Sequence, residues 1–305
     1  MLRGETTRSI EKLEDSLDYG LDKFYINDKN NDLDHYSQME IILSNKGYQD
    51  INEIGKGGSG IVVSASKNND NRVALKSTIC NPYSSSIETP WEILNMEAKN
   101  LEFLHDKKVP NIVDFYGFES AFFDGFYGGF LELELCKDSA FDKEVYETSE
   151  LVNHTLDIAD SLYYMHEAGL VHGDIKPSNI LMNYSGKVKL VDLATARKPR
   201  KFYESSPFSP GFLAPELFNT TIRSRSGDVF SLAATLYRAL TGENVREKSY
   251  ESIMSPFEAP TAPRDLDVEI SGGLEYAIMS GLEAYDRPNL GEFVELIEKS
   301  PESVN

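Results

Sequence analysis

The chain has 305 residues, 40% of them hydrophobic, and a formal net charge of -20. A chain of this length and composition can bury a sizeable core, in one large domain or two lobes, without disulfides or structural metals. Its acidity repels phosphate backbones and anionic lipids, so we expect no nucleic-acid partner and no membrane partner.

The two cysteines, Cys80 and Cys136, are far apart in the sequence and form neither a disulfide framework nor a metal-ligand motif. This predicts a reducing compartment. The first residues contain no apolar run of signal-peptide length, and no stretch approaches the roughly 18 apolar residues of a membrane span. We therefore expect a cytoplasmic protein.

Residues 1–46 form an acidic extension with one amphipathic helix predicted in it. Apolar residues recur there every three to four positions, at Ile10, Leu13, Leu17, Leu21 and Phe24. Such spacing places them on one helix face, which either packs on the main domain or recruits a partner. The run "NDKNND" at 27–32 predicts a linker.

Strand-like runs dominate from residue 48 to about 135. They read "GIVVSAS", "RVALKST", "NIVDFYGF" and "GFLELEL", and they surround one predicted helix. Helical patterns dominate after residue 149. This order predicts an α+β protein with a small β-rich lobe at 47–136 and a larger helical lobe at 137–300.

The first chemical motif is glycine-rich: Gly55, Gly57 and Gly60 are spaced as G-x-G-x-x-G and are followed by Val62. Glycines let the backbone approach a phosphate closely, because no side chain intervenes. The β-branched residues after Gly60 favour a strand, whereas a dinucleotide-binding turn would open a helix. The motif therefore predicts a phosphate-covering hairpin, with a plain turn as the alternative.

A lysine and a glutamate form the next candidate pair. Lys76 ends an apolar strand-like run, and Glu97 falls on the leucine-rich face of the following helix. The helix start is marked by Thr89, Pro90 and Glu92. A carboxylate among leucines needs a cation, and Lys76 is the natural partner unless Glu97 reaches water at the edge of the face.

The stretch "HGDIKPSNIL" begins just after a predicted helix and ends in a predicted strand. Its proline excludes a continuous helix, so its polar residues lie on a loop. A hairpin turn at "NYSG" would bring Asn179 and Asp192 to the same end of two strands. With Asp174 to accept a hydroxyl proton and Lys176 beside it, these residues suit phosphoryl transfer, the Asn/Asp pair holding magnesium.

Over residues 48 to about 299 the chain resembles a eukaryotic-type (Hanks-type) serine/threonine protein kinase. The resemblance lies in the motifs above and in four further matches. Val73-Ala74-Leu75-Lys76 is similar to the family's lysine strand, and Ala214-Pro215-Glu216 is similar to its A-P-E sequence. "SGDVFSLAATLYRALTG" resembles the central helix with its Asp228, and Arg287 matches the usual partner of the A-P-E glutamate.

The resemblance implies a bilobal kinase fold, ATP and Mg²⁺ as cofactors, and protein substrates with serine or threonine hydroxyls. It makes Asp174 the catalytic base, Lys176 the residue that steadies the phosphoryl group, Lys76 and Glu97 an ion pair, and Asn179 and Asp192 the magnesium ligands. The nucleotide-binding residues it implies are Gly55, Lys56, Gly57, Gly58, Ser59, Gly60, Val62, Ala74, Lys76, Leu133, Glu134 and Cys136.

Two departures from the family pattern matter. Gly173 stands where H-R-D has an arginine, which in the family commonly pairs with an activation-loop phosphate. We therefore expect activity that does not depend on activation-loop phosphorylation. Ala194 stands where D-F-G has glycine and loses access to positive φ, which predicts a stiffer metal loop.

Two other functions stay open. H-G-D also occurs in aminoglycoside- and choline-kinase-like phosphotransferases, although Lys176-Pro177 and the A-P-E sequence favour a protein substrate. A pseudokinase scaffold is disfavoured because the expected catalytic residues are all retained, namely Lys76, Glu97, Asp174, Asn179 and Asp192. The basic run "RKPRK" at 197–201 is either a solvated loop, a site for an acidic substrate, or a clamp for Tyr203 and Ser205 once modified. The isolated histidines, His166 among them, suggest no metal role.

Overall fold

The computed structural model describes residues 35–57, 60–67, 71–80, 90–123, 126–141, 147–199, 209, 211–217, 222–246 and 258–303. The helix and linker predicted within residues 1–34 lie outside the described residues, as do Gly58, Ser59, Thr89, Tyr203 and Ser205. The chain divides into two compact units. The sheet unit comprises Met1–Asn95 and Gly117–Glu132, and the helical unit comprises Met96–Tyr116 and Leu133–Asn305.

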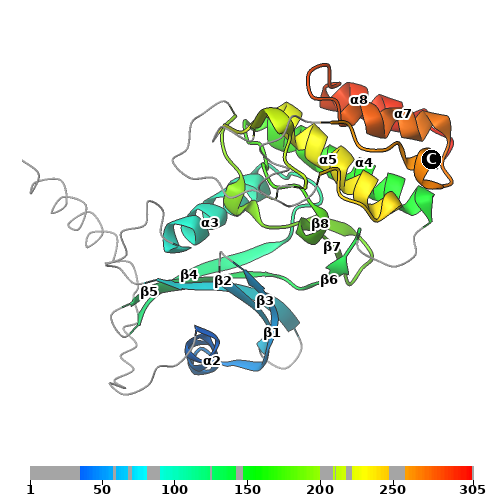
Figure 1. Ribbon diagram of the computed structural model, residues 1–305. Helices are drawn as coiled ribbons and strands as arrows, with labels where there is room; N and C mark the ends of the chain where they lie inside the picture. Colours follow the sequence, from blue (N-terminus) through cyan, green and yellow to red (C-terminus); the bar gives the residue numbers. More distant parts are fainter. Residues whose placement is uncertain are drawn as a thin grey trace, which may run out of the picture. The chain divides into compact units, whose positions relative to one another are not determined.

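The sheet unit is built on a five-stranded sheet in the order β1-β2-β3-β5-β4 (Figure 1). The strands are β1 (Tyr48–Gly57), β2 (Gly60–Lys67), β3 (Asn71–Cys80), β4 (Phe115–Phe123) and β5 (Phe126–Glu134). β1, β2 and β3 form an antiparallel meander, in which Gly57 pairs with Gly60 and Val62 pairs with Lys76. The glycine-rich motif therefore spans a β-hairpin, as its strand-forming residues predicted.

Helix α2 (His35–Asn45) packs against this sheet and was not predicted. Its Met39 and Leu43 join a buried apolar cluster with Tyr48, Val63 and Leu75. The run of apolar residues in α2 is short and lacks an acidic first turn or a basic last turn, so the sequence gives little helix signal. Burial of these residues under the sheet stabilises the helix.

The helical unit contains α4 (Thr148–Glu167), α5 (Arg225–Thr241), α7 (Gly272–Gly281) and α8 (Leu290–Glu298), and most of α3 (Pro90–Asp106). Helices α4, α5, α7 and α8 pack on one another (Figure 1). A small sheet in the order β6-β7-β8 is formed by Cys136–Ser139, Ile180–Asn183 and Val188–Leu190. Short 3₁₀ turns connect these elements: η1 (Pro177–Asn179), η2 (Leu193–Thr195), η3 (Pro215–Leu217) and η4 (Pro263–Leu266).

Helix α5 is the buried centre of this unit, since every residue from 227 to 237 is buried. The Ser224 hydroxyl caps its start by accepting the backbone N–H of Gly227, and Gly242 ends it in the left-handed region, with φ of 76°. The predicted α+β class, a β-rich part with a larger helical part, is confirmed. Among the described residues no helix combines the length and apolarity needed to cross a membrane.

Candidate active site

The loop between α4 and β7 brings together three of the predicted polar residues. The Lys176 Nζ donates to Asp174 Oδ2 at 2.6 Å, and the Asn179 Nδ2 donates to the same oxygen at 3.2 Å and to the Asp174 carbonyl oxygen at 2.8 Å. Lys176 also donates to the Ser209 hydroxyl at 2.8 Å. The Asp174 carboxylate is thus oriented by a cation and an amide. We call residues 172–179 the catalytic loop.

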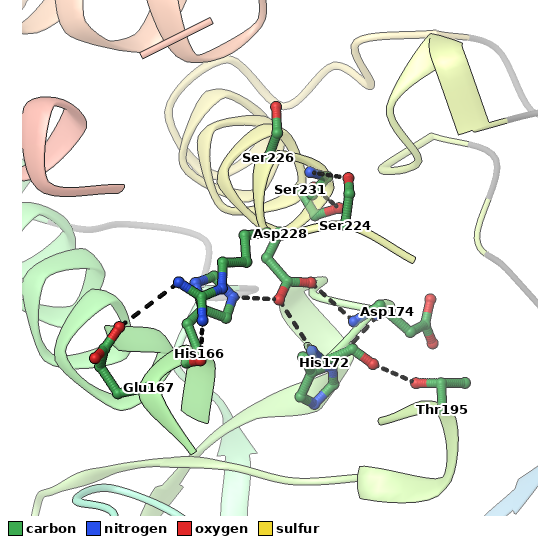
Figure 2. Close-up of polar contacts among 12 residues, drawn as sticks. His166, Glu167, His172, Asp174, Thr195, Ser224, Ser226, Asp228 and Ser231 are labelled. Atoms are coloured by element: carbon green, nitrogen blue, oxygen red, sulfur yellow. Dashed lines mark hydrogen bonds and ion pairs between the residues drawn. The ribbon is translucent and has the colours of Figure 1, made fainter. Parts of the chain in front are cut away.

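Asp228, in the first turn of α5, projects from that helix toward this loop and anchors it (Figure 2). Its carboxylate accepts hydrogen bonds from the backbone N–H groups of His172, at 2.9 Å, and Gly173, at 2.8 Å. It also accepts one from the ring of His166, at 2.8 Å. Burial alone would raise the pKa of Asp228, but the hydrogen bonds from His166 and Gly173 and the nearby histidine rings hold that pKa below its usual range.

The other predicted metal ligand, Asp192, follows strand β8. Ile180 pairs with Leu190, and the backbone N–H of Val191 donates to the Asn179 carbonyl at 2.9 Å. The predicted hairpin is therefore present, and Asn179 and Asp192 lie at the same end of it. Asp192 adopts a left-handed conformation, with φ of 61° and ψ of 65°, which Asp tolerates better than most side chains.

The segment after Asp192 is fixed by side chains that donate hydrogen bonds to its backbone carbonyl oxygens, and the sequence did not predict these contacts. Asn100, on α3, donates to the carbonyl oxygens of Leu193, at 2.9 Å, and Ala196, at 3.1 Å. Arg197 donates to the carbonyl oxygens of Ala194, at 2.5 Å, and Ala196, at 3.0 Å. Arg197 is only 8% exposed, so the solvated-loop interpretation of the basic run is wrong for this residue.

In the sheet unit, Lys76 is buried on β3 opposite Val62, with Ala74 two residues before it on the same strand. Gly60 has φ of +131°, and a Cβ on it would lie 2.0 Å from the Ser77 carbonyl oxygen. A glycine is required here by both conformation and space. The glycine-rich hairpin thus lies directly beside the lysine strand.

Glu97 is 1% exposed on α3, so the alternative in which it reaches water is wrong. Lys76 and Glu97 belong to different units, and their ion pair stays a prediction.

The predicted adenine-binding stretch, Leu133 to Cys136, runs from the end of β5 to the start of β6. The Glu134 backbone N–H donates to the Asp114 carbonyl at 2.8 Å, and its carboxylate accepts from Asn183 at 2.8 Å and lies 3.1 Å from Lys189. Burial, reinforced by nearby carboxylates, raises the pKa of the Cys136 thiol to about 12, so this thiol is protonated at neutral pH. The stretch from Leu133 to Cys136 is therefore held in place by the helical unit's own side chains.

A second predicted contact is present at the A-P-E sequence. The Arg287 guanidinium donates to Glu216 at 2.8 Å and 3.3 Å, a bidentate pairing. It also donates to the backbone carbonyl and hydroxyl oxygens of Ser226.

The oxygen donors of Asn179 and Asp192 fit magnesium. Asn179 uses its amide nitrogen toward Asp174, which leaves its amide oxygen as the group able to bind a metal. Among the described residues no group of three or more His, Cys, Asp or Glu forms a metal cage. Magnesium suits so small a donor set, because it commonly takes one or two protein ligands and completes its shell with water and phosphate oxygens.

These features define a bilobal α+β phosphotransferase architecture with a kinase-type catalytic loop. The family model for the protein kinase domain matches residues 48–269. The chain belongs to the protein kinase family, as its motifs predicted.

Curated relatives support this membership. The chain is 29% identical over 235 residues to the "Probable serine/threonine-protein kinase zyg-1" of Caenorhabditis elegans, covering 73% of this chain and 31% of the relative. It is 28% identical over 254 residues to the "Dual specificity mitogen-activated protein kinase kinase dSOR1" of Drosophila melanogaster, covering 79% and 60%. It is 32% identical over 157 residues to the "MAP kinase kinase kinase SSK2" of Saccharomyces cerevisiae, covering 50% and 9%. The chain thus spans less than two thirds of each of these relatives.

Proposed function

We propose that this chain is a serine/threonine protein kinase that transfers the γ-phosphoryl group of ATP to hydroxyl groups of protein substrates. The observation that carries the proposal is the convergence of Lys176 and Asn179 on the Asp174 carboxylate. Protein kinases use such an aspartate to orient the substrate hydroxyl and accept its proton. The relatives named as serine/threonine kinases support the same substrate class.

Each residue has a role in this chemistry. Asp174 accepts the hydroxyl proton, and Lys176 offers positive charge beside it where the phosphoryl group is transferred. Asn179 and Asp192 would hold Mg²⁺, which when bound neutralises charge on the phosphates. The glycine-rich hairpin and Lys76 would bind the ATP phosphates, and residues 133–136 the adenine. Catalysis is then mainly positioning and charge neutralisation.

Labelled ATP, magnesium and a mixed protein substrate test this proposal. We expect labelled protein with the parent chain and a loss of at least about 100-fold with Asp174→Ala, because a positioned general base contributes that much or more. Calorimetry should still detect magnesium-dependent ATP binding in the Asp174→Ala variant. Transfer only to small aminoglycosides or choline would favour a small-molecule phosphotransferase. Binding of Mg·ATP without any transfer would favour a pseudokinase scaffold.

Three further features belong to the proposal. Activity should not depend on activation-loop phosphorylation, since Gly173 provides no side chain to bind a phosphate. The amphipathic helix predicted in the acidic N-terminal segment either packs on the main domain or recruits a partner, as its apolar face allows both. A cytoplasmic location is also part of the proposal, and the sparse cysteine content supports it.

A further inference from the structure

The position of the missing loop arginine is occupied from another part of the chain. Gly173 has φ of +79°, and a Cβ on it would lie 2.6 Å from both the Cδ and the Nε atoms of Arg223. Real Cβ atoms do not approach other heavy atoms this closely, so Arg223 fills the space into which a side chain at residue 173 would project. The glycine of H-G-D and this arginine are therefore complementary in shape.

Arg223 comes from the segment that leads into α5. It immediately precedes Ser224, the N-cap of that helix, while Asp228 in the first turn accepts the backbone N–H of Gly173 at 2.8 Å. The start of α5 therefore contacts residue 173 in two ways. Asp228 accepts its backbone N–H, and Arg223 occupies the space where a side chain would project. One rigid, buried element defines both contacts.

The Arg223 side chain, which carries a positive charge, is also buried. The side chain is 1% exposed and is the largest among the described residues to be so fully buried. Burial lowers the pKa of Arg223 and Arg197 lowers it further, whereas the carboxylates of Asp174 and Asp228 favour its charged form. A guanidinium remains protonated in proteins, so Arg223 supplies a fixed positive charge to these two carboxylates.

We propose that Arg223 is a positioning residue for the catalytic loop, supplying from the start of α5 the volume and positive charge that glycine omits at residue 173. The inference rests on the proposed kinase activity and deepens it. Because the cation is internal and faces internal carboxylates, it does not need an added phosphate to be neutralised. A loop supported in this way is positioned without phosphorylation, which fits the expected independence from that modification.

The test compares variants of the full chain. Arg223→Met keeps much of the side-chain volume and removes the charge, and Arg223→Lys keeps the charge. Arg264→Met removes the same charge from a side chain that is 55% exposed on the same unit, and it serves as the matched control. The readouts are kcat, KM for ATP, and the stoichiometry of Mg·ATP binding, which reports the folded fraction.

We expect Arg223→Met to lower kcat about tenfold, in keeping with the coupling seen between contacting residues, while KM for ATP changes less than about twofold. Arg223→Lys should recover part of the loss, and Arg264→Met should match the parent. An Arg223→Met variant that binds Mg·ATP and turns over like the parent overturns the inference. A parent chain with no transfer at all would instead overturn the proposed function.

The reciprocal exchange, Gly173→Arg with Arg223→Gly, covers the case in which Arg223→Met does not fold. This double variant places an arginine at residue 173, and the glycine at residue 223 leaves room for its side chain. Recovery of folding and transfer relative to Arg223→Gly alone supports the inference, although the positive φ at residue 173 should keep the recovery incomplete. An exchange variant no better than Arg223→Gly in both measurements overturns it.

Discussion

The Asp228 carboxylate lies 2.8 Å from the Nε2 atom of His166, which precedes it by 62 residues, and both side chains are buried. This pair links the end of α4 to the start of α5, and through the backbone amides of His172 and Gly173 it fixes the catalytic loop. The Asp228 carboxylate thus both joins α4 to α5 and fixes the loop that carries Asp174.

Replacing Asp228 by Asn should destabilise the fold at neutral pH by about 3 kcal/mol, because a buried hydrogen-bonded carboxylate is lost from its network. The pKa of Asp228 is depressed from its ordinary value of 3.8, so its contribution is complete above that pH and is lost as the pH falls through the folded-state pKa. Urea unfolding from pH 8 to 3 should show a constant difference between parent and variant down to about pH 5. The difference should shrink below about pH 4. A difference that grows as the pH falls would contradict this assignment.

The segment after Asp192 should loosen in Asn100→Ala. The variant loses two hydrogen bonds to the carbonyl oxygens of Leu193 and Ala196, each contributing about 1 kcal/mol. Amide hydrogen exchange over residues 192–197 should be faster than in the parent, with α7 unchanged as the internal control. Ala194→Gly should also speed exchange, because glycine restores backbone freedom that alanine denies. Equal protection in all three proteins would mean that neither feature stiffens the loop.

The sequence predicted those parts of the fold in which the deciding contacts are local. The hairpin that brings Asn179 and Asp192 together follows from a turn and two short strands, whereas the central place of α5 was expected only from the resemblance to the kinase family. The roles of Asn100, His166 and Arg223 could not be predicted, since each depends on a partner more than 45 residues away in the chain. The filling of the space beside Gly173 by the Arg223 side chain can be recognised only from the three-dimensional positions of the two residues.

Gly60→Ala should impair ATP binding through the glycine-rich hairpin. The added Cβ would lie 2.0 Å from the Ser77 carbonyl oxygen at a φ that alanine rarely adopts, so β2 and β3 must shift. We expect KM for ATP to rise about tenfold or more, with the helical unit unaffected. Gly117→Ala, on β4 of the same unit and outside the glycine-rich motif, is the matched control, because no heavy atom lies within 4 Å of the added Cβ and its φ is ordinary. The prediction fails if both variants bind ATP equally well.

Asp192→Asn isolates the charge of the proposed metal ligand. Asparagine tolerates the left-handed backbone of residue 192, so the fold should be kept while one anionic oxygen is lost. The magnesium concentration for half-maximal transfer should rise, and the maximal rate should fall by about 100-fold or more. Titration of magnesium at saturating ATP gives both quantities, and the thermal unfolding midpoint should match the parent. An unchanged magnesium requirement would exclude Asp192 as a ligand.

Activity should not require phosphorylation of the activation segment. The candidate acceptors are Ser205 and Ser206, which lie outside the described residues, and Ser209, whose hydroxyl accepts a hydrogen bond from Lys176 at 2.8 Å. Ser205→Ala and Ser206→Ala should keep the parent's rate within about twofold. Ser209→Ala should lose about three- to tenfold, because Lys176 loses a partner worth about 1 kcal/mol. Phosphatase treatment of the parent should reproduce none of these losses, since the Ser209 effect arises from its hydroxyl and not from a phosphate. A large loss in any of the three variants that phosphatase does reproduce would show that a phosphate is required.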